Sequence, residues 1–175
     1  ALVATNAPPY GGILTVSPDT APFGTMVSLV ATQFTDAVED LPLRYRFELS
    51  RIRVNESTGD RSLVERQILS QETQAAELQT NALAVGNHTA LAIAIDAHGG
   101  EGVAEAAVAV AMPPGSGADI LSLAREAMAE VSGGVEGASG TVAHVAAIAS
   151  LLGDEHTGGD AATAREELMA GLILA

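Results

Sequence analysis

The stretch that decides the fold is Pro42-Leu43-Arg44-Tyr45-Arg46-Phe47, followed directly by Glu48 and Leu49. Apolar and charged side chains alternate along it, and this period of two predicts a β-strand with one buried face. The predicted inner face carries Leu43, Tyr45, Phe47 and Leu49. The predicted outer face carries Arg44, Arg46 and Glu48. Because the chain has only 2 Tyr and 3 Phe, a strand that holds one of each is expected to anchor a core.

Short apolar runs separated by turn residues occur on both sides of this strand. We expect strands at residues 11–16, 25–31, 42–54 (with a bend near Ser50), 63–69, 89–95 and 103–112. Residues 71–84 are rich in Ala, Glu and Gln, which favour a helix, but their position between strands favours a strand near 76–80. About seven short strands with this spacing are typical of an immunoglobulin-like β-sandwich.

The sequence pattern changes after residue 112. A run of Pro, Gly and Ser at 113–117 predicts a linker, and beyond it apolar residues recur every three or four positions, as in helices. We therefore predict a sandwich domain at 1–112, a linker at 113–117 and a small helical segment at 118–175 that is incomplete at its C-terminus. The predicted fold class is mainly β, an immunoglobulin-like sandwich followed by a small helical segment.

Composition limits the classes of partner. The chain has 22 acidic and 8 basic residues, a net charge of −14, and this argues against nucleic acid or an anionic membrane surface as the main partner. It has no Cys, which excludes disulfides and thiolate chemistry. No apolar run reaches the roughly 18 residues that span a bilayer. We read the chain as a piece of a longer protein and expect membrane contact only through residues outside it.

Several runs in the first half share the pattern of one family: Ala7-Pro8-Pro9, Gly11-Gly12, Leu14-Thr15-Val16-Ser17-Pro18, Gly24-Thr25, Phe34-Thr35-Asp36 and Asp40-Leu41-Pro42-Leu43-Arg44-Tyr45-Arg46-Phe47. They resemble the receptor-for-egg-jelly (REJ) module of polycystin-1-like membrane glycoproteins and sperm egg-jelly receptors. The later run from Gly86 to Gly100 is similar to the penultimate strand and turn of fibronectin-III-like and PKD-like sandwiches.

The resemblance implies a non-enzymatic structural or interaction role on the extracellular face of the plasma or ciliary membrane. The implied partner is a polycystin-2-like channel subunit or an extracellular filament protein. The alternative is a secreted matrix or cell-wall glycoprotein module without a channel partner.

Two tripeptides fit the N-glycosylation sequon, Asn55-Glu56-Ser57 and Asn87-His88-Thr89. Both fall in predicted surface turns, and an extracellular protein would carry glycans there. The same tripeptides also occur by chance, so the resemblance to an extracellular family is what favours Asn55 and Asn87 as glycosylation sites.

Four arginines, Arg44, Arg46, Arg51 and Arg53, form a candidate cationic stripe on an acidic protein. One interpretation is a docking face for an acidic partner or glycan, since guanidinium groups pair with carboxylates. The other, which we favour, is cross-strand pairing with Glu48, Glu65 and their neighbours.

Two alanine rows, at 90, 92, 94 and at 107, 109, 111, suggest a smooth sheet surface packed by the helical tail. The alternatives are packing by a partner subunit and a simple alanine bias of the composition. Asp36, Glu39, Asp40 and Asp96 lack the spacing of a calcium loop, so we read them as acidic turn residues. The four His are scattered, and no nucleophile elbow or P-loop occurs. We therefore predict no catalytic residues, no metal and no cofactor.

Overall fold

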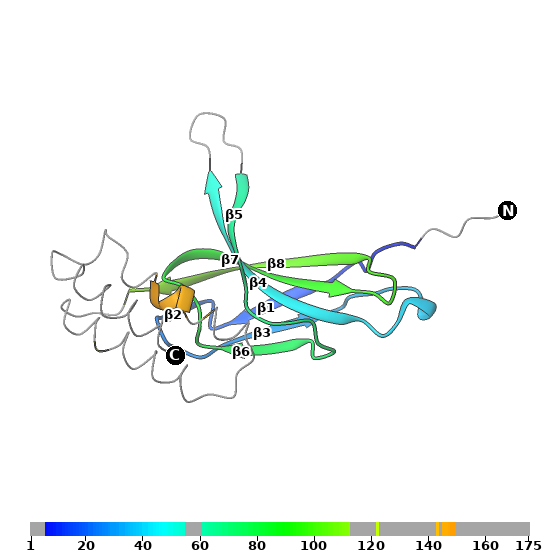
Figure 1. Cartoon of the computed structure of the whole chain (residues 1–175), viewed down its shortest axis with the longest axis horizontal. Helices are drawn as coiled ribbons and strands as arrows, with labels where there is room; N and C mark the ends of the chain where they lie inside the picture. Colours follow the sequence, from blue (N-terminus) through cyan, green and yellow to red (C-terminus); the bar gives the residue numbers. More distant parts are fainter. Residues whose placement is uncertain (1–5, 55–60, 113–121, 123–142, 144, 150–175) are drawn as a thin grey trace, which may run out of the picture. The chain divides into compact units, whose positions relative to one another are not determined.

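The computed structural model describes residues 6–54, 61–112, 122, 143 and 145–149 (Figure 1). The side chains of 52–54 and 61–65 fall outside this description. The chain forms two compact units. The first comprises Ala1–Thr20, Met26–Thr80 and Asn87–Ala109, and the second comprises Ala21–Thr25, Asn81–Gly86 and Val110–Ala175.

Two sheets make up the described β-structure. One has the order β1 (Ile13–Ser17), β3 (Val27–Thr32), β6 (Glu77–Thr80). The other has the order β2 (Thr20–Pro22), β8 (Glu101–Ala111), β7 (Gly86–Ile95), β4 (Arg44–Val54), β5 (Arg61–Ile68). A short 3-10 helix, η1 (Val38–Asp40), lies between β3 and β4. This architecture confirms the predicted mainly-β sandwich.

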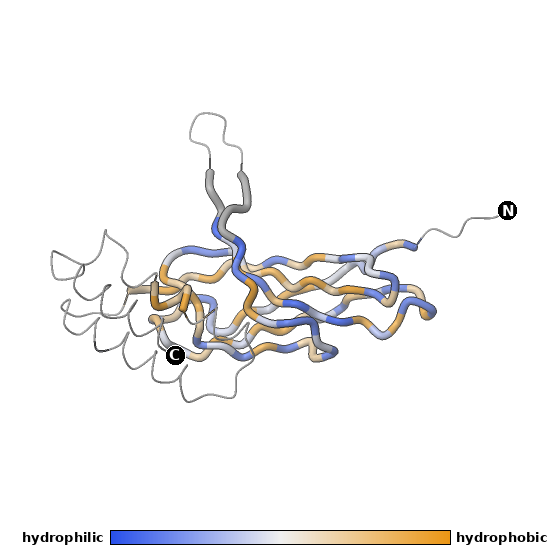
Figure 2. Tube along the Cα trace, viewed as in Figure 1, coloured by the Kyte–Doolittle hydropathy of each residue, from blue (hydrophilic) through white to orange (hydrophobic). Residues whose placement is uncertain are grey.

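The strand β4 anchors the core, as its sequence predicts. Phe47 is fully buried and Leu49 almost so, whereas Arg44, on the alternate face, is exposed. Figure 2 shows this alternation of hydrophobic and hydrophilic residues along the strands. The register of β4 with β5 shifts between Leu49 and Arg51, which is where the sequence predicts a bend.

The alanine row of β7 lies on the inner face, and our expectation of a smooth outer surface there is wrong. Ala90, Ala92 and Ala94 are paired with Leu49, Phe47 and Tyr45 and are fully buried. Small side chains beside Phe47 and Leu49 leave room for these larger groups between the sheets. The outer face of β7 instead carries Leu91, Ile93 and Ile95, opposite Glu48, Arg46 and Arg44.

The described part of the second unit has its own buried side chains. The N–H of Phe23 donates to the carbonyl of Ala111 at 3.0 Å. The buried apolar residues of this unit are Ala21, Ala82, Leu83, Ala84, Val110, Ala143, Ala147 and Ile148. Residues 145–149 are helical. The predicted linker at 113–117 and most of the predicted helical segment lie outside the described residues.

Candidate functional site

An ion-pair network, here called the outer-face network, covers one face of the five-stranded sheet. The carboxylate of Glu48 accepts a hydrogen bond from Arg46 Nε at 2.8 Å and another from Arg66 Nε at 2.7 Å. Arg46 also reaches Glu72 at 3.4 Å. Arg44 pairs with the other oxygen of Glu72 at 2.9 Å.

Arg46 extends across the middle of this sheet. Its guanidinium reaches Glu101 of β8 at 3.3 Å, and β7 lies between β4 and β8. Its side chain therefore crosses the outer face of β7, where Ile93 is only 1% exposed. Burial by itself would lower the pKa of Arg46, but Glu48 and Glu101 outweigh it and raise this pKa, so the group stays charged.

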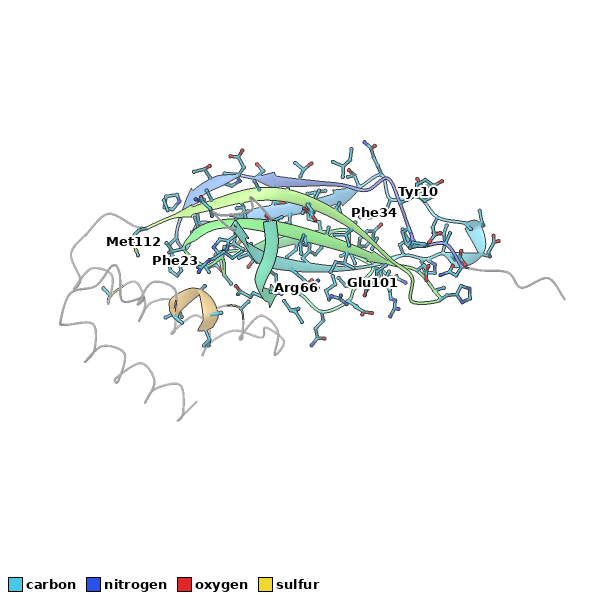
Figure 3. All side chains as sticks on the ribbon, turned by 90° about the horizontal axis from the view of Figure 1, so that it is seen from above. Tyr10, Phe23, Phe34, Arg66, Glu101 and Met112 are labelled. Carbon is cyan, nitrogen blue, oxygen red and sulfur yellow. The ribbon has the colours of Figure 1, made fainter. Side chains whose placement is uncertain are left out.

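Among the side chains that the structure describes, three arginines (Arg44, Arg46 and Arg66) meet three glutamates (Glu48, Glu72 and Glu101) in this network, so their charges balance. Figure 3 shows Arg66 and Glu101 on one side of the view and Tyr10 and Phe34 on the other.

The predicted arginine stripe is divided in the structure. Arg44 and Arg46 meet in the outer-face network, where Arg44 pairs with Glu72, and Arg46 pairs with Glu48 of its own strand and with Glu101 of β8. Arg51 is exposed and lies beyond the register shift of β4. The side chain of Arg53 lies outside the described residues. A role of these arginines in binding a partner stays a prediction.

Asp96 organises the turn between β7 and β8. Its side chain is fully buried and accepts hydrogen bonds from the backbone N–H groups of His98 (2.7 Å) and Gly100 (2.8 Å). The amide of Asn6 donates to the second oxygen at 2.7 Å. The Asn6 hydrogen bond, followed by the two backbone N–H groups, lowers the pKa of Asp96 and outweighs the effect of burial. Asp96 is therefore a structural anion that fastens the incoming chain to this turn.

Asp40, in η1, has the opposite electrostatic setting. Its side chain is buried, and burial followed by the neighbouring Asp36 raises its pKa, whereas His98 acts to lower it. His98 Nε2 lies 3.2 Å from Asp40 Oδ1, and the carbonyl of Asp40 accepts from the N–H of Ala97 at 3.0 Å. These contacts tie η1 to the turn after β7.

The segment before β1 is fixed at the same end of the sheet. Tyr10 and Thr35 exchange two backbone hydrogen bonds, at 3.0 and 2.9 Å. A Cβ on Gly102, the second residue of β8, would lie 2.0 Å from the carbonyl oxygen of Pro9. Gly102 is therefore the position at which the incoming backbone packs directly on β8.

The two predicted glycosylation sites differ in what the structure says of them. Asn87 is exposed at the start of β7, where an attached group would reach solvent. Asn55 lies outside the described residues. The use of either site stays a prediction.

Among the residues that the structure describes, no group of three or more His, Cys, Asp or Glu is arranged to hold a metal ion. The described helical residues also include no helix long and apolar enough to cross a membrane.

Several residues of these clusters are missed by sequence reasoning. Arg66, Glu72 and Glu101 come from β5, the segment after it and β8, so their meeting with Arg46 depends on strand order. Asn6 lies 90 residues from Asp96, and no local pattern indicates their contact. The sequence Asp96-Ala97-His98-Gly99-Gly100 does carry a local signal, since Asp followed by glycines is typical of a tight turn.

Comparison with known proteins adds little to this picture. No model of a known family matches the sequence, and no curated protein matches it significantly. Solved structures that resemble it include carbohydrate-binding modules from the β-sandwich superfamily (18% identity, TM-score 0.42, 65% of this chain and 38% of that one). A second is a fibronectin(III)-like module of Clostridium thermocellum CbhA (17% identity, TM-score 0.38, 59% of this chain and 100% of that one). A third is the superoxide reductase of Ignicoccus hospitalis (11% identity, TM-score 0.33, 59% of this chain and 82% of that one).

The chain thus spans 38% of the length of the carbohydrate-binding-module structure. At these identities and TM-scores the likenesses carry no argument about function. The fold assignment rests on the two sheets and their register.

Proposed function

We propose that the sandwich is a non-catalytic extracellular module that spaces and connects the parts of a larger cell-surface glycoprotein. The observation that carries this proposal is the path of the chain through the first unit. Asn6 and Pro9 lie at the end that holds the Asp96 turn and the start of β8. From there β8 leads the chain away along the sheet.

The length of β8 gives the scale of this path. At about 3.3 Å per residue, the seven steps from Gly102 to Ala109 cover about 23 Å. The chain therefore enters the first unit at one end of the sheet and leaves near the other. Modules with this path can be joined in line, and each one then adds length between its neighbours.

The attachment of the segment before β1 to the first unit is a second observation that supports a spacing role. Three contacts hold the incoming segment: the Asn6–Asp96 hydrogen bond, the Pro9–Gly102 contact and the Tyr10–Thr35 bridge. A segment held at several points transmits the orientation of what precedes it, whereas an unattached linker lets adjoining parts rotate.

The finer identity that we propose is the REJ module of a polycystin-1-like glycoprotein. It rests on the sequence runs around Leu14–Pro18 and Asp40–Phe47 and on the resemblance that they carry. The proposed partner is a polycystin-2-like channel subunit or an extracellular filament protein. N-glycans on Asn55 and Asn87 fit this setting, and the exposure of Asn87 supports it.

The test is purification of the protein from its native membranes, with mass spectrometry of its partners and glycopeptides. The proposal predicts glycopeptides that include Asn87 and a co-purifying channel subunit or filament protein. Recovery as a glycosylated protein without membrane association would favour the secreted matrix or cell-wall alternative. Recovery from the cytosol without glycans would contradict the extracellular proposal altogether.

A further inference from the structure

One contact between η1 and the turn after β7 joins a buried carboxylate to an exposed imidazole. His98 Nε2 lies 3.2 Å from Asp40 Oδ1, and the side chain of His98 is 61% exposed whereas that of Asp40 is 9% exposed. The carbonyl of Asp40 also accepts from the N–H of Ala97, at 3.0 Å. Here η1 and the turn are therefore joined by one backbone hydrogen bond and by one contact whose strength depends on charge.

The surroundings of Asp40 make its negative charge costly. Burial raises its pKa most. Three carboxylates raise this pKa further: Asp36 on the segment before η1, Asp96 at the start of the turn and Glu39 on η1 itself. His98 acts in the opposite direction. The Oδ2 atom of Asp36 is also buried and has no hydrogen-bond partner among the described residues. A positive charge on His98 would offset this accumulation of negative charge.

Protonation of the imidazole changes the strength of its contact with Asp40. Histidine is the side chain whose charge ordinarily changes between pH 5 and pH 8. A neutral imidazole forms at most an ordinary hydrogen bond with a carboxylate. An imidazolium forms a charge-assisted hydrogen bond, which is roughly twice as strong. The same two atoms therefore hold η1 and the turn together more firmly when the imidazole is charged.

We propose that the His98–Asp40 contact is an acid-strengthened latch, which fastens η1 to the turn between β7 and β8. The latch is closed when His98 carries a proton and Asp40 does not. It weakens as the pH rises and the imidazole loses its proton, and it weakens again in strong acid, where the carboxylate is protonated. The proposal concerns the fold of the first unit and does not depend on its proposed role as a spacer.

The latch adjoins both attachments of the incoming segment. Asn6 donates to Asp96, which lies two residues before His98 in the same turn. Tyr10 bridges Thr35, which lies in the segment that leads into η1. Closing the latch therefore joins the two structures that hold the incoming chain, and acidification tightens this end of the sandwich.

The test is a double-mutant cycle in the whole chain, made of Asp40→Asn, His98→Gln and the double variant. Urea unfolding at pH 8 and at about pH 5.5 gives the coupling between the two side chains, and the titration of the other histidines cancels in the cycle. We expect this coupling, as a ratio of unfolding equilibrium constants, to be about three- to fivefold larger at the lower pH. That is the upper part of the range for exposed ion pairs, because Asp40 is buried.

Hydrogen exchange of the Ala97 N–H reports on the latch directly, because this group donates to the carbonyl of Asp40. The rate in His98→Gln is compared with that in the unmodified chain at the same pH, which removes the intrinsic pH dependence of exchange. The substitution should speed exchange by about three- to fivefold more at about pH 5.5 than at pH 8. An imidazole that only fills space would give the same ratio at both pH values.

The control cycle combines His98→Gln with Glu39→Gln. Glu39 is exposed on the same 3-10 helix, so its substitution removes a negative charge but leaves the His98–Asp40 contact in place. Its coupling with His98 should change by less than about twofold between the two pH values, since salt screens exposed charges. The proposal is overturned if the Asp40–His98 coupling is equal at both pH values, or if the Glu39 cycle matches it. It is also overturned if His98→Gln speeds the exchange of Ala97 equally at both.

Discussion

Gly102→Ala tests whether the incoming segment is packed on β8. The added Cβ would lie 2.0 Å from the carbonyl oxygen of Pro9 and 2.7 Å from its carbonyl carbon. Ordinary contacts begin near 3.4 Å, so the two backbones must separate by more than 1 Å. Overpacking of this kind typically destabilises by about 1–3 kcal/mol. We expect Gly102→Ala to lower the free energy of unfolding by that amount. We also expect a protease to cut the segment before β1 faster in this variant than in the unmodified chain.

The assay is urea unfolding of Gly102→Ala in the whole chain and in a chain that lacks residues 1–9. Without Pro9 the clash disappears, so the cost of the substitution should fall close to zero. Gly12→Ala is the matched control, because its Cβ would meet the ring of Phe34 at 2.2 Å and its cost should be the same in both backgrounds. An equal cost of Gly102→Ala with and without residues 1–9 would refute the packing of this segment on β8.

Four further predictions concern the charged clusters and the glycan. Asp96→Asn should lower the free energy of unfolding at pH 7, because the pKa of Asp96 is lowered in the folded state and its charged form therefore stabilises the fold. The difference from the unmodified chain should shrink as the pH falls below about 3.9, the unfolded-state pKa, and through the lower folded-state pKa. Asp40→Asn should raise the free energy of unfolding at pH 7, because the pKa of Asp40 is raised in the folded state and its charged form therefore destabilises the fold. This difference should disappear on acidification to about pH 3.9. Urea unfolding from pH 7 to pH 3 measures the sign of the effect for Asp96→Asn and for Asp40→Asn. Glu48→Gln should cost about 1–3 kcal/mol, whereas Glu72→Gln, at a side chain that is 37% exposed, should cost less than about 1 kcal/mol in the same assay. Asn87→Gln should remove one glycan from the protein secreted by eukaryotic cells, and an unchanged intact mass would contradict use of this site.

Much of the fold follows from local pattern. The alternation at 43–49 predicts the burial of Leu43, Phe47 and Leu49 but not that of Glu48, which is 3% exposed, and the strand expected near 76–80 is β6. These predictions succeed because a strand with one buried face needs a period of two. The short β2 was missed, since Thr20-Ala21-Pro22 is too short to show any period.

The clusters were harder to predict than the strands. The sequence of β7 shows that one face carries small side chains and the other carries large ones. It does not show which face lies inside the sandwich, because the side chains of both faces are buried. That choice is made by pairing: Ala92 lies opposite Phe47, and Ile93 lies opposite Arg46. Likewise, an arginine shows no local sign of the glutamate that it meets two strands away. Such contacts depend on strand order, which local periodicity does not contain.

The separation of entry and exit in the first unit is the claim on which the spacing role depends. Because the chain has no Cys, Ala7→Cys and Ala109→Cys allow one pair of spin labels to be attached without interference. Electron–electron double resonance should give a separation of about 25–30 Å, the length of β8 from its start to Ala109 at about 3.3 Å per residue. A separation below about 15 Å would mean that the chain enters and leaves at the same end, and would contradict the in-line module.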